Sequence, residues 1–250
     1  MLDLHRWDPD VATRPEPRRA ARDLAVRVLL PAVVWGAVIV GLGMLLDGPL
    51  RWVAEREDPV SRWFVEQRTA TLDALSAFAS HVGNTQWIIA VCVLVVAAVW
   101  WRTRRWWYAV VPAVALSAQV MVFLGSSALV GRSRPDVEQL DEAPPTSSFP
   151  SGHSGASTAL YVTLALMAQR IRRTWLRVVL TVVLLLVPVL VMTSRLYRGM
   201  HHPSDVLVGC VNGLLCAVLG WGWLSTPRSK AADDAHAVDA DGSTTTGARR

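Results

Sequence analysis

Cysteine and lysine are scarce in this chain of 250 residues, which has three cysteines and a single lysine, Lys230. Cys92, Cys210 and Cys216 all lie in apolar stretches without metal-ligand spacing, so we expect inert, buried thiols and no metal or other cofactor. Charge is also scarce over long stretches, although 52% of the residues are hydrophobic and the mean hydropathy is +0.32. This pattern excludes an ordinary soluble domain and indicates a polytopic membrane protein.

The net charge of +5 does not indicate a nucleic-acid partner. The basic residues flank the apolar blocks, where membrane topology needs them, and they form no stripe interleaved with aromatic side chains. Membrane lipids are the expected surroundings. The oligomeric state is left open by the sequence.

Six apolar segments predict an all-α protein, a six-helix transmembrane bundle with one domain over residues 28–224. The expected spans are residues 28–46, 87–101, 106–130, 154–168, 175–193 and 206–224. The second and fourth are shorter than the roughly 20 residues that cross a bilayer, but each can extend into polar flanks. Residues 1–27 are expected to form a mobile cytoplasmic tail, and residues 225–250 a disordered cytoplasmic tail.

Lysine and arginine predict the orientation of this bundle. With the N-terminus inside, the cytoplasmic side holds 17 of these residues and the outer side holds 8. The positive-inside rule therefore places both termini in the cytoplasm, in a membrane that we take to be the plasma membrane.

The segment 61–81 is too polar for a span. Leu72, Leu75, Phe78 and Ala79 recur at helical spacing, which favours a surface helix in the outer headgroup layer. A loop without regular structure is nearly as compatible with the pattern.

Three polar stretches fall at the outer ends of the expected spans. Polar groups without a partner or a function are energetically unfavourable there. They comprise residues 131–135, 149–153 and 194–205. In the expected topology all three face outward, and they can converge in one pocket at the membrane surface.

The second and third stretches contain the groups of an anion site with proton-transfer residues. Ser151 and Gly152 precede an apolar helix, whose free N–H groups and positive dipole end bind phosphate oxygens. His153 follows and can reach a leaving oxygen. His201 and Asp205 are four residues apart, so on a helix the carboxylate would hold one ring nitrogen and leave the other as a nucleophile.

Arginines complete this expected site. Arg134 and Arg195 can each offer a planar fork to phosphate, although a lone arginine at a span end more often only snorkels to the interface. His202 is out of register with these groups and is expected in the pocket wall or in solvent. An acidic run in the outer loop predicts a solvated face rather than a metal site: Asp136, Glu138, Asp141 and Glu142.

The stretches resemble the motifs of the type 2 phosphatidic acid phosphatase superfamily. Residues 150–153 read Pro-Ser-Gly-His, and residues 194–205 match Ser-Arg-x5-His-x3-Asp at every fixed position. The first stretch is similar to the Lys-x6-Arg-Pro motif at Arg134 and Pro135 only, because Ser127 stands where that motif has lysine. Arg132 and Arg198 are candidates to replace the missing charge, and we favour Arg132.

The resemblance implies a catalytic phosphatase domain and assigns roles. His201 would attack phosphorus to form a phosphohistidine, His153 would protonate the leaving group, and Asp205 would orient His201. The phosphate-binding groups would be Arg134, Arg195, Ser151 and Gly152, with Arg132 as a further candidate. No metal is implied.

The expected function is therefore hydrolysis of a lipid phosphomonoester or diphosphate at the extracytoplasmic face. Phosphatidic acid, phosphatidylglycerol phosphate and a polyprenyl diphosphate are all compatible substrates. Two alternatives stay open. One is a lipid phosphotransferase, and the other is a transporter or lipid-binding protein without catalysis. The vanadium haloperoxidases have a similar site, but they are soluble, and the six expected spans argue against their activity.

Overall fold

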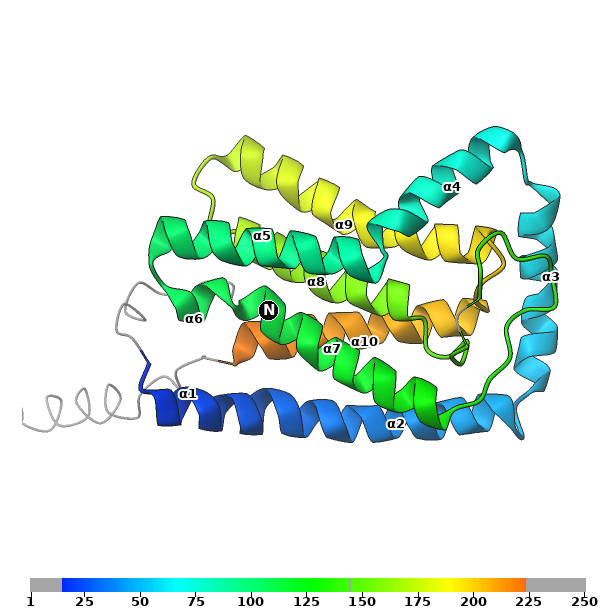
Figure 1. Ribbon diagram of the computed structural model, residues 1–250, viewed down its shortest axis with the longest axis horizontal. Coiled ribbons are helices and arrows are strands. Elements are labelled where there is room, and N and C mark those ends of the chain that lie inside the picture. Colours follow the sequence, from blue (N-terminus) through cyan, green and yellow to red (C-terminus); the bar gives the residue numbers. More distant parts are fainter. Residues whose placement is uncertain (1–14, 144, 224–250) are drawn as a thin grey trace, which may run out of the picture.

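Helices make up the whole regular structure of the part of the chain that the computed structural model describes, residues 15–143 and 145–223 (Figure 1). In chain order they are α1 (Pro17–Leu24), the π-helical η2 (Ala25–Leu29), α2 (Leu30–Asp47), α3 (Trp52–Glu66), α4 (Ala70–Val82), α5 (Thr85–Thr103), α6 (Trp106–Ala109), α7 (Val111–Leu129), α8 (Gly152–Ala168), α9 (Thr174–Tyr197) and α10 (Pro203–Gly222). The all-α prediction is confirmed for these residues. The expected C-terminal tail, 225–250, lies outside them.

Five of these helical stretches are long and apolar enough to cross a membrane, as expected for an integral membrane protein. They are Pro17–Asp47, Thr85–Thr103, Val111–Leu129, Thr174–Tyr197 and Pro203–Gly222. The remaining expected span corresponds to α8, which has 17 residues and so lies at the lower end of the usual range of about 17–25. The count of six spans stays a prediction.

The first long helix begins at Pro17, within the tail expected over residues 1–27, of which residues 1–14 lie outside the described part of the chain. Proline suits the first turn of a helix, because its missing N–H would have no partner there. Asp23 then lies 4.0 Å from Arg19 and 3.8 Å from Arg27, one helical turn away on either side. These pairs let the helix extend into a polar segment, which composition alone indicated as a tail.

The expected surface helix over 61–81 is two helices rather than one. Thr69 interrupts the pattern: its backbone is extended, and its side chain accepts a hydrogen bond from the Leu72 amide at the start of α4. The hydrophobic face of α4 is exposed, since Leu72, Leu75 and Phe78 have 42%, 60% and 71% of their surface accessible.

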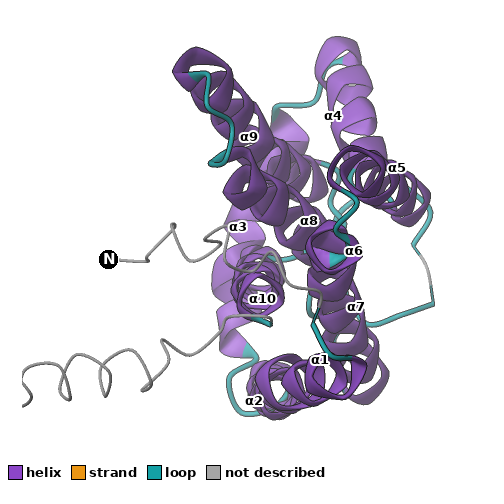
Figure 2. Cartoon of the chain, turned by 90° about the vertical axis from the view of Figure 1, so that its left-hand side faces the viewer, coloured by secondary structure: helices purple, strands orange, loops and turns teal. Residues whose placement is uncertain are grey.

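The central helix of the bundle is α8, which packs against α7, α9 and α10 (Figure 2). Its buried side chains are mostly small or hydroxylated, and this lets neighbouring backbones approach closely. A Cβ added to Gly209 of α10 would lie 2.5 Å from the Ser151 carbonyl oxygen, and one added to Gly213 would lie 2.5 Å from that of Gly155. Close backbone contact therefore fixes α10 against the start of α8.

The outer surface of the bundle is apolar. On α9 the exposed side chains include Val178, Val179, Val182, Val183, Leu185, Leu186, Val189 and Leu190. In water this surface would be a large hydrophobic patch, whereas in a bilayer it faces acyl chains.

The three polar stretches come together at one end of the bundle (Figure 1). The end of α7, the start of α8, the end of α9 and the start of α10 all lie there, and α3 crosses the same end. The fold therefore places the three polar stretches on the same side of the bundle, as the sequence predicted.

Replacing Gly213 tests the contact between α8 and α10. Gly213→Ala is expected to lower the thermal unfolding midpoint in detergent, by an overpacking cost of about 1–3 kcal/mol, because the new methyl group meets backbone. Gly125→Ala on α7 is the matched control, since nothing lies within 4 Å of its added Cβ. Equal midpoints for the two variants would contradict the close packing.

Candidate active site

The long loop between α7 and α8 is tied to the third polar stretch by backbone hydrogen bonds. The amide of Leu140 donates to the Arg198 carbonyl at 3.1 Å, and the amide of Ser151 donates to the Asp205 carbonyl at 3.0 Å. Within the loop, the Ser148 amide donates to the Arg132 carbonyl at 3.0 Å. The first two of these bonds bring together residues that are about 55 positions apart in the sequence.

The start of α8 has the form expected of an anion site. Ser151 is the N-cap: it is fully buried, and its hydroxyl accepts from the Ser154 amide at 3.4 Å and from the Ser154 hydroxyl at 2.9 Å. Gly152 and His153 face the cavity described below. Ser151 does not line that cavity, so its hydroxyl stabilises the helix start.

The start of α10 differs from the expected arrangement, because His201 is not on the helix. Pro203 is the first helical residue, and the residue before a proline avoids the helical conformation, so His202 is extended with ψ 155°. Asp205 sits in the first turn, and its Oδ2 accepts a hydrogen bond from the His202 amide at 2.9 Å. The i, i+4 pair on one helical face is therefore replaced by a helix cap.

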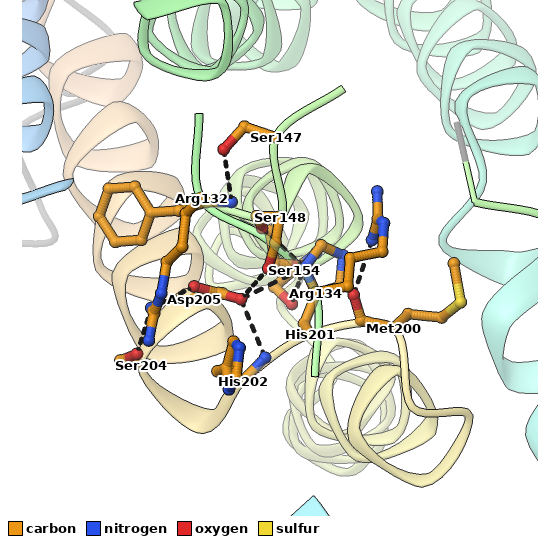
Figure 3. A network of polar contacts seen from close by, with 12 residues as sticks. Arg132, Arg134, Ser147, Ser148, Ser154, Met200, His201, His202, Ser204 and Asp205 are labelled. Carbon is orange, nitrogen blue, oxygen red and sulfur yellow. Dashed lines mark hydrogen bonds and ion pairs between the residues drawn. The ribbon is translucent and has the colours of Figure 1, made fainter. Parts of the chain in front are cut away.

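Asp205 is fully buried and has donors on both oxygens (Figure 3). Arg132 donates to Oδ1 at 2.6 Å, whereas Oδ2 accepts from the Ser148 hydroxyl as well as from the His202 amide. The carboxylate thus joins the loop between α7 and α8 to the start of α10.

His201 is held by a backbone carbonyl. Its Nδ1 lies 2.8 Å from the Ser148 carbonyl oxygen and 3.8 Å from Asp205 Oδ2. A carbonyl oxygen can only accept, so Nδ1 carries the proton and Nε2 keeps its lone pair. Asp205 acts on the ring through its charge and through Ser148, not by the direct hydrogen bond that the sequence suggested.

Burial lowers the pKa of His201 below its ordinary value of 6.5, although Asp205 partly opposes this effect. His153 lines the same cavity, and burial, followed by the nearby Arg195 and His201, lowers its pKa to about 3. Both rings are therefore neutral at neutral pH when the site is empty.

Two arginines face this pair of histidines. Arg134 donates to the Met200 carbonyl at 2.6 Å, and it forms no ion pair with the described residues. Arg195 lies 2.7 Å from Asp141 and 2.6 Å from the Ser80 hydroxyl. Both can direct further N–H groups at a bound anion.

Asp141 belongs to the acidic run that the sequence indicated as a solvated face, but it is part of the site. Its carboxylate lies 2.7 Å from both Arg195 and Arg198. Burial raises the pKa of Asp141, but the hydrogen bonds and charges of the two arginines outweigh this effect and lower it overall. Asp141 is therefore ionised at neutral pH and neutralises part of the positive charge around the cavity.

These groups line one cavity of about 680 Å³. The site residues on its wall are His201, His153, Gly152, Arg134 and Arg195. A second part of the wall is apolar and comes from α5 and α7: Ile88, Ile89, Leu116, Val120, Phe123 and Leu124. The cavity thus joins a cationic end with two histidines to a hydrophobic end.

A comparison with protein families matches the part of the chain that carries these residues. Residues 107–229 match the model of the PAP2 superfamily, and this stretch includes all three motifs. This region of the chain belongs to the PAP2 superfamily. No curated protein sequence matches the chain.

Two solved structures share the PAP2 fold with this chain. One is a transmembrane PAP2-type phosphatidylglycerolphosphate phosphatase from Bacillus subtilis, which is 20% identical, with 78% of this chain and 94% of that chain covered and a TM-score of 0.66. The other is LpxE of Aquifex aeolicus, which is 18% identical, with 65% and 93% covered and a TM-score of 0.53.

Ser127 stands where the PAP2 motif has a lysine, and Arg132 does not replace the missing charge as the sequence suggested. Ser127 does not line the cavity, and neither does Arg132. Arg132 is 3% exposed in its side chain and is paired with Asp205 and Glu57, on the other side of Asp205 from His201 and Arg134 (Figure 3). Arg198 pairs with Asp141. Both candidates thus hold carboxylates in the empty site.

Ser148, Asp141 and Glu57 are the residues that sequence reasoning missed. Ser148 and Asp141 lie in an irregular loop, where spacing says nothing about contacts. Glu57 lies on α3, about 75 residues before its partner Arg132. The one available signal was Arg132 beside the first motif. If that arginine is buried, it requires a carboxylate partner, and this would have indicated that an acid such as Glu57 exists.

A change of pH tests the buried state of His201. Because its pKa is lower in the folded protein than the 6.5 of an exposed histidine, His201 contributes stability above pH 6.5 that is lost as the pH falls below it. The unfolding midpoint of the wild type should therefore fall more steeply between pH 7.5 and 5 than that of His201→Gln. Parallel curves would contradict a neutral, buried His201.

Removing the charge of Asp141 tests whether this carboxylate offsets the positive charge of Arg195 and Arg198 beside the cavity. Asp141→Asn leaves Arg195 and Arg198 without their counter-charge, so the empty protein should unfold at a lower temperature. Orthovanadate, a phosphate mimic, should then raise the midpoint more than it does in the wild type. Glu142→Gln is the control, since Glu142 lines the cavity but is exposed. An unchanged vanadate effect in Asp141→Asn would refute this role.

Proposed function

We propose that the protein is a lipid phosphatase that hydrolyses a phosphomonoester or diphosphate through a phosphohistidine on His201. The observation that carries the proposal is the geometry of His201. Its Nδ1 is held by the Ser148 carbonyl at 2.8 Å, and its ring lines the same cavity as Arg134, Arg195 and His153. A nucleophile, an acid and two cations thus surround a space that can hold one phosphoryl group.

The first step forms the bond between His201 Nε2 and phosphorus and breaks the bond between phosphorus and the leaving oxygen. Arg134, Arg195 and the free N–H groups at the start of α8 stabilise the charge on the phosphoryl oxygens. His153 gives its proton to the leaving alkoxide or phosphate. Burial is the largest cause of the low pKa of His153, and the positive charges of the arginines add to it. A bound phosphate dianion offsets those charges and so shifts the pKa of His153 upward, toward the protonated form that this step needs.

The second step returns the site to its starting state. Neutral His153 takes a proton from water as the water oxygen attacks phosphorus, and the bond to His201 Nε2 breaks. Inorganic phosphate leaves, and His153 is protonated again. No metal takes part in either step.

The shape of the cavity supports a lipid as the substrate. Ile89, Val120 and Leu124 line it, and 51%, 38% and 56% of their surface is accessible. These residues belong to α5 and α7, whose outer faces would lie against acyl chains. A lipid could place its phosphate among the arginines and keep its chains in the bilayer.

The substrate could be of the phosphatidic acid, phosphatidylglycerol phosphate or polyprenyl diphosphate type. The Bacillus subtilis structure, a phosphatidylglycerolphosphate phosphatase, supports including the second of these. With 17 lysines and arginines on one side of the expected topology and 8 on the other, we place both termini in the cytoplasm. The site then faces the extracytoplasmic surface, which we take to be that of the plasma membrane.

Phosphate release by the purified protein tests this proposal. With a chelator present, the protein should release phosphate from at least one of the three lipids, and His201→Ala should lower the rate at least about 1,000-fold because the nucleophile is lost. His81→Ala is the matched control, at an exposed histidine of α4 that lines the cavity but takes no part in the proposed chemistry. Release by His201→Ala at the wild-type rate would rule the proposal out. Phosphoryl transfer to an added alcohol without phosphate release would favour a phosphotransferase.

A further inference from the structure

A series of alternating charges runs from α3 to His201. Glu57 Oε2 lies 3.2 Å from Arg132 Nη2, and Arg132 Nη1 lies 2.6 Å from Asp205 Oδ1. Asp205 Oδ2 in turn lies 3.8 Å from His201 Nδ1. The side chains of Glu57, Arg132 and Asp205 are 15%, 3% and 0% exposed, so solvent screens these charges weakly.

Glu57 also holds the first turn of α10. Its Oε1 accepts from the Ser204 amide at 2.8 Å, and its Oε2 accepts from the Ser204 hydroxyl at 2.8 Å. The Arg132 guanidinium donates to the same hydroxyl at 2.7 Å. Ser204 directly precedes Asp205, so Glu57 reaches Asp205 by two routes, through Arg132 and through the backbone.

The charges along this series have a definite effect on His201. Arg132 alone would cancel much of the negative field that Asp205 exerts on the ring. Glu57 restores it, because the three groups together carry a net charge of −1. His201 gains positive charge when its Nε2 bonds to phosphorus, so a net negative group behind Nδ1 stabilises that step.

We propose that Glu57 of α3 is a positioning residue for the reaction, which orients Asp205 through Arg132 and Ser204 and keeps the charge behind His201 negative. The proposal rests on the proposed function. Glu57, Arg132 and Asp205 do not line the cavity, so this series acts on the nucleophile and not on the bound phosphate. It also gives Arg132 a role other than replacing the lysine that is absent at Ser127.

Glu57→Gln tests the charge with little change of shape, since the amide oxygen can still accept from Ser204. In metal sites, loss of a group that orients a metal ligand through a hydrogen bond typically costs about 10–100-fold in affinity or activity, and we expect an effect of similar size here. The variant should therefore have a kcat about tenfold or more below that of the wild type on the best lipid substrate, with KM changed by less than about threefold. Glu55→Gln, at an exposed position of the same helix, is the matched control and should match the wild type.

The pH dependence of kcat/KM distinguishes an electrostatic role of Glu57 from a structural one. The informative part is the acid limb, the range in which kcat/KM falls as the pH is lowered. The charged and titratable groups that act on His201 come from α10, α9, α8 and the loop before α8: Asp205, Arg195, His153 and Arg134. His202, whose Nδ1 lies 4.0 Å from Glu57 Oε2, is a further titratable group beside this series. Glu57→Gln removes one negative charge behind this set, which disfavours protonated His201 and moves the acid limb to lower pH. The double variant Glu57→Gln with Arg132→Gln removes one charge of each sign, so its acid limb should return toward that of the wild type.

Several results would overturn the proposal. One is a Glu57→Gln variant with the kcat and the acid limb of the wild type. Another is a lower kcat with an unchanged acid limb in Glu57→Gln and in the double variant, because that result indicates a structural role. If Glu57→Gln does not fold, Glu57→Asp keeps the charge and should retain its acid limb at the wild-type pH; a shift in that variant would also contradict the account. A wild type that releases no phosphate from any lipid would instead reject the proposed function, since the Glu57 proposal predicts differences between variants of an active enzyme.

Discussion

Asp205 is the residue on which the rest of the site depends. Its buried carboxylate accepts from Arg132, from the Ser148 hydroxyl and from the His202 amide, which belong to different segments of the chain. A buried carboxylate without donors would be strongly unfavourable, so these segments are held together wherever Asp205 is ionised. Ser148 then uses its own carbonyl to fix Nδ1 of His201. The position of the nucleophile thus follows from satisfying one buried charge.

The same requirement explains why so many charges lie around a small cavity. Phosphate needs cations, but several buried guanidinium groups would repel one another in the empty site. Asp141 neutralises part of this charge through Arg195 and Arg198, whereas Asp205 and Glu57 surround Arg132. Among the described residues, Arg134 has the Met200 carbonyl as its one hydrogen-bond partner. In the proposed reaction, Arg134 can therefore bind phosphate without losing an ion pair, whereas phosphate and Asp141 would compete for Arg195.

The sequence predicted the helices and the convergence of the motifs well, because both rest on local signals. Apolar runs of spanning length and the polar stretches at their ends are visible without a structure. The helix boundary before Pro17 and the break at Thr69 were missed, because ion pairs and one side-chain cap decide them. In the site, His153 and His201 line one cavity as expected, but the partners of His201 were not foreseen. Ser148 acts through a backbone carbonyl, and Glu57 comes from a distant helix; neither contact leaves a periodic pattern in the sequence.

The central claim is that phosphate passes through a covalent bond to His201, and trapping that bond tests it most directly. The protein would be mixed with a lipid carrying a labelled phosphate, quenched in alkaline denaturant within the first turnover, and mapped by mass spectrometry. The account predicts a phosphate on Nε2 of His201, labile to acid and stable to base, which forms and decays at rates compatible with kcat. A phosphate on another residue, or turnover without any labelled protein under conditions that preserve phosphohistidine, would contradict it.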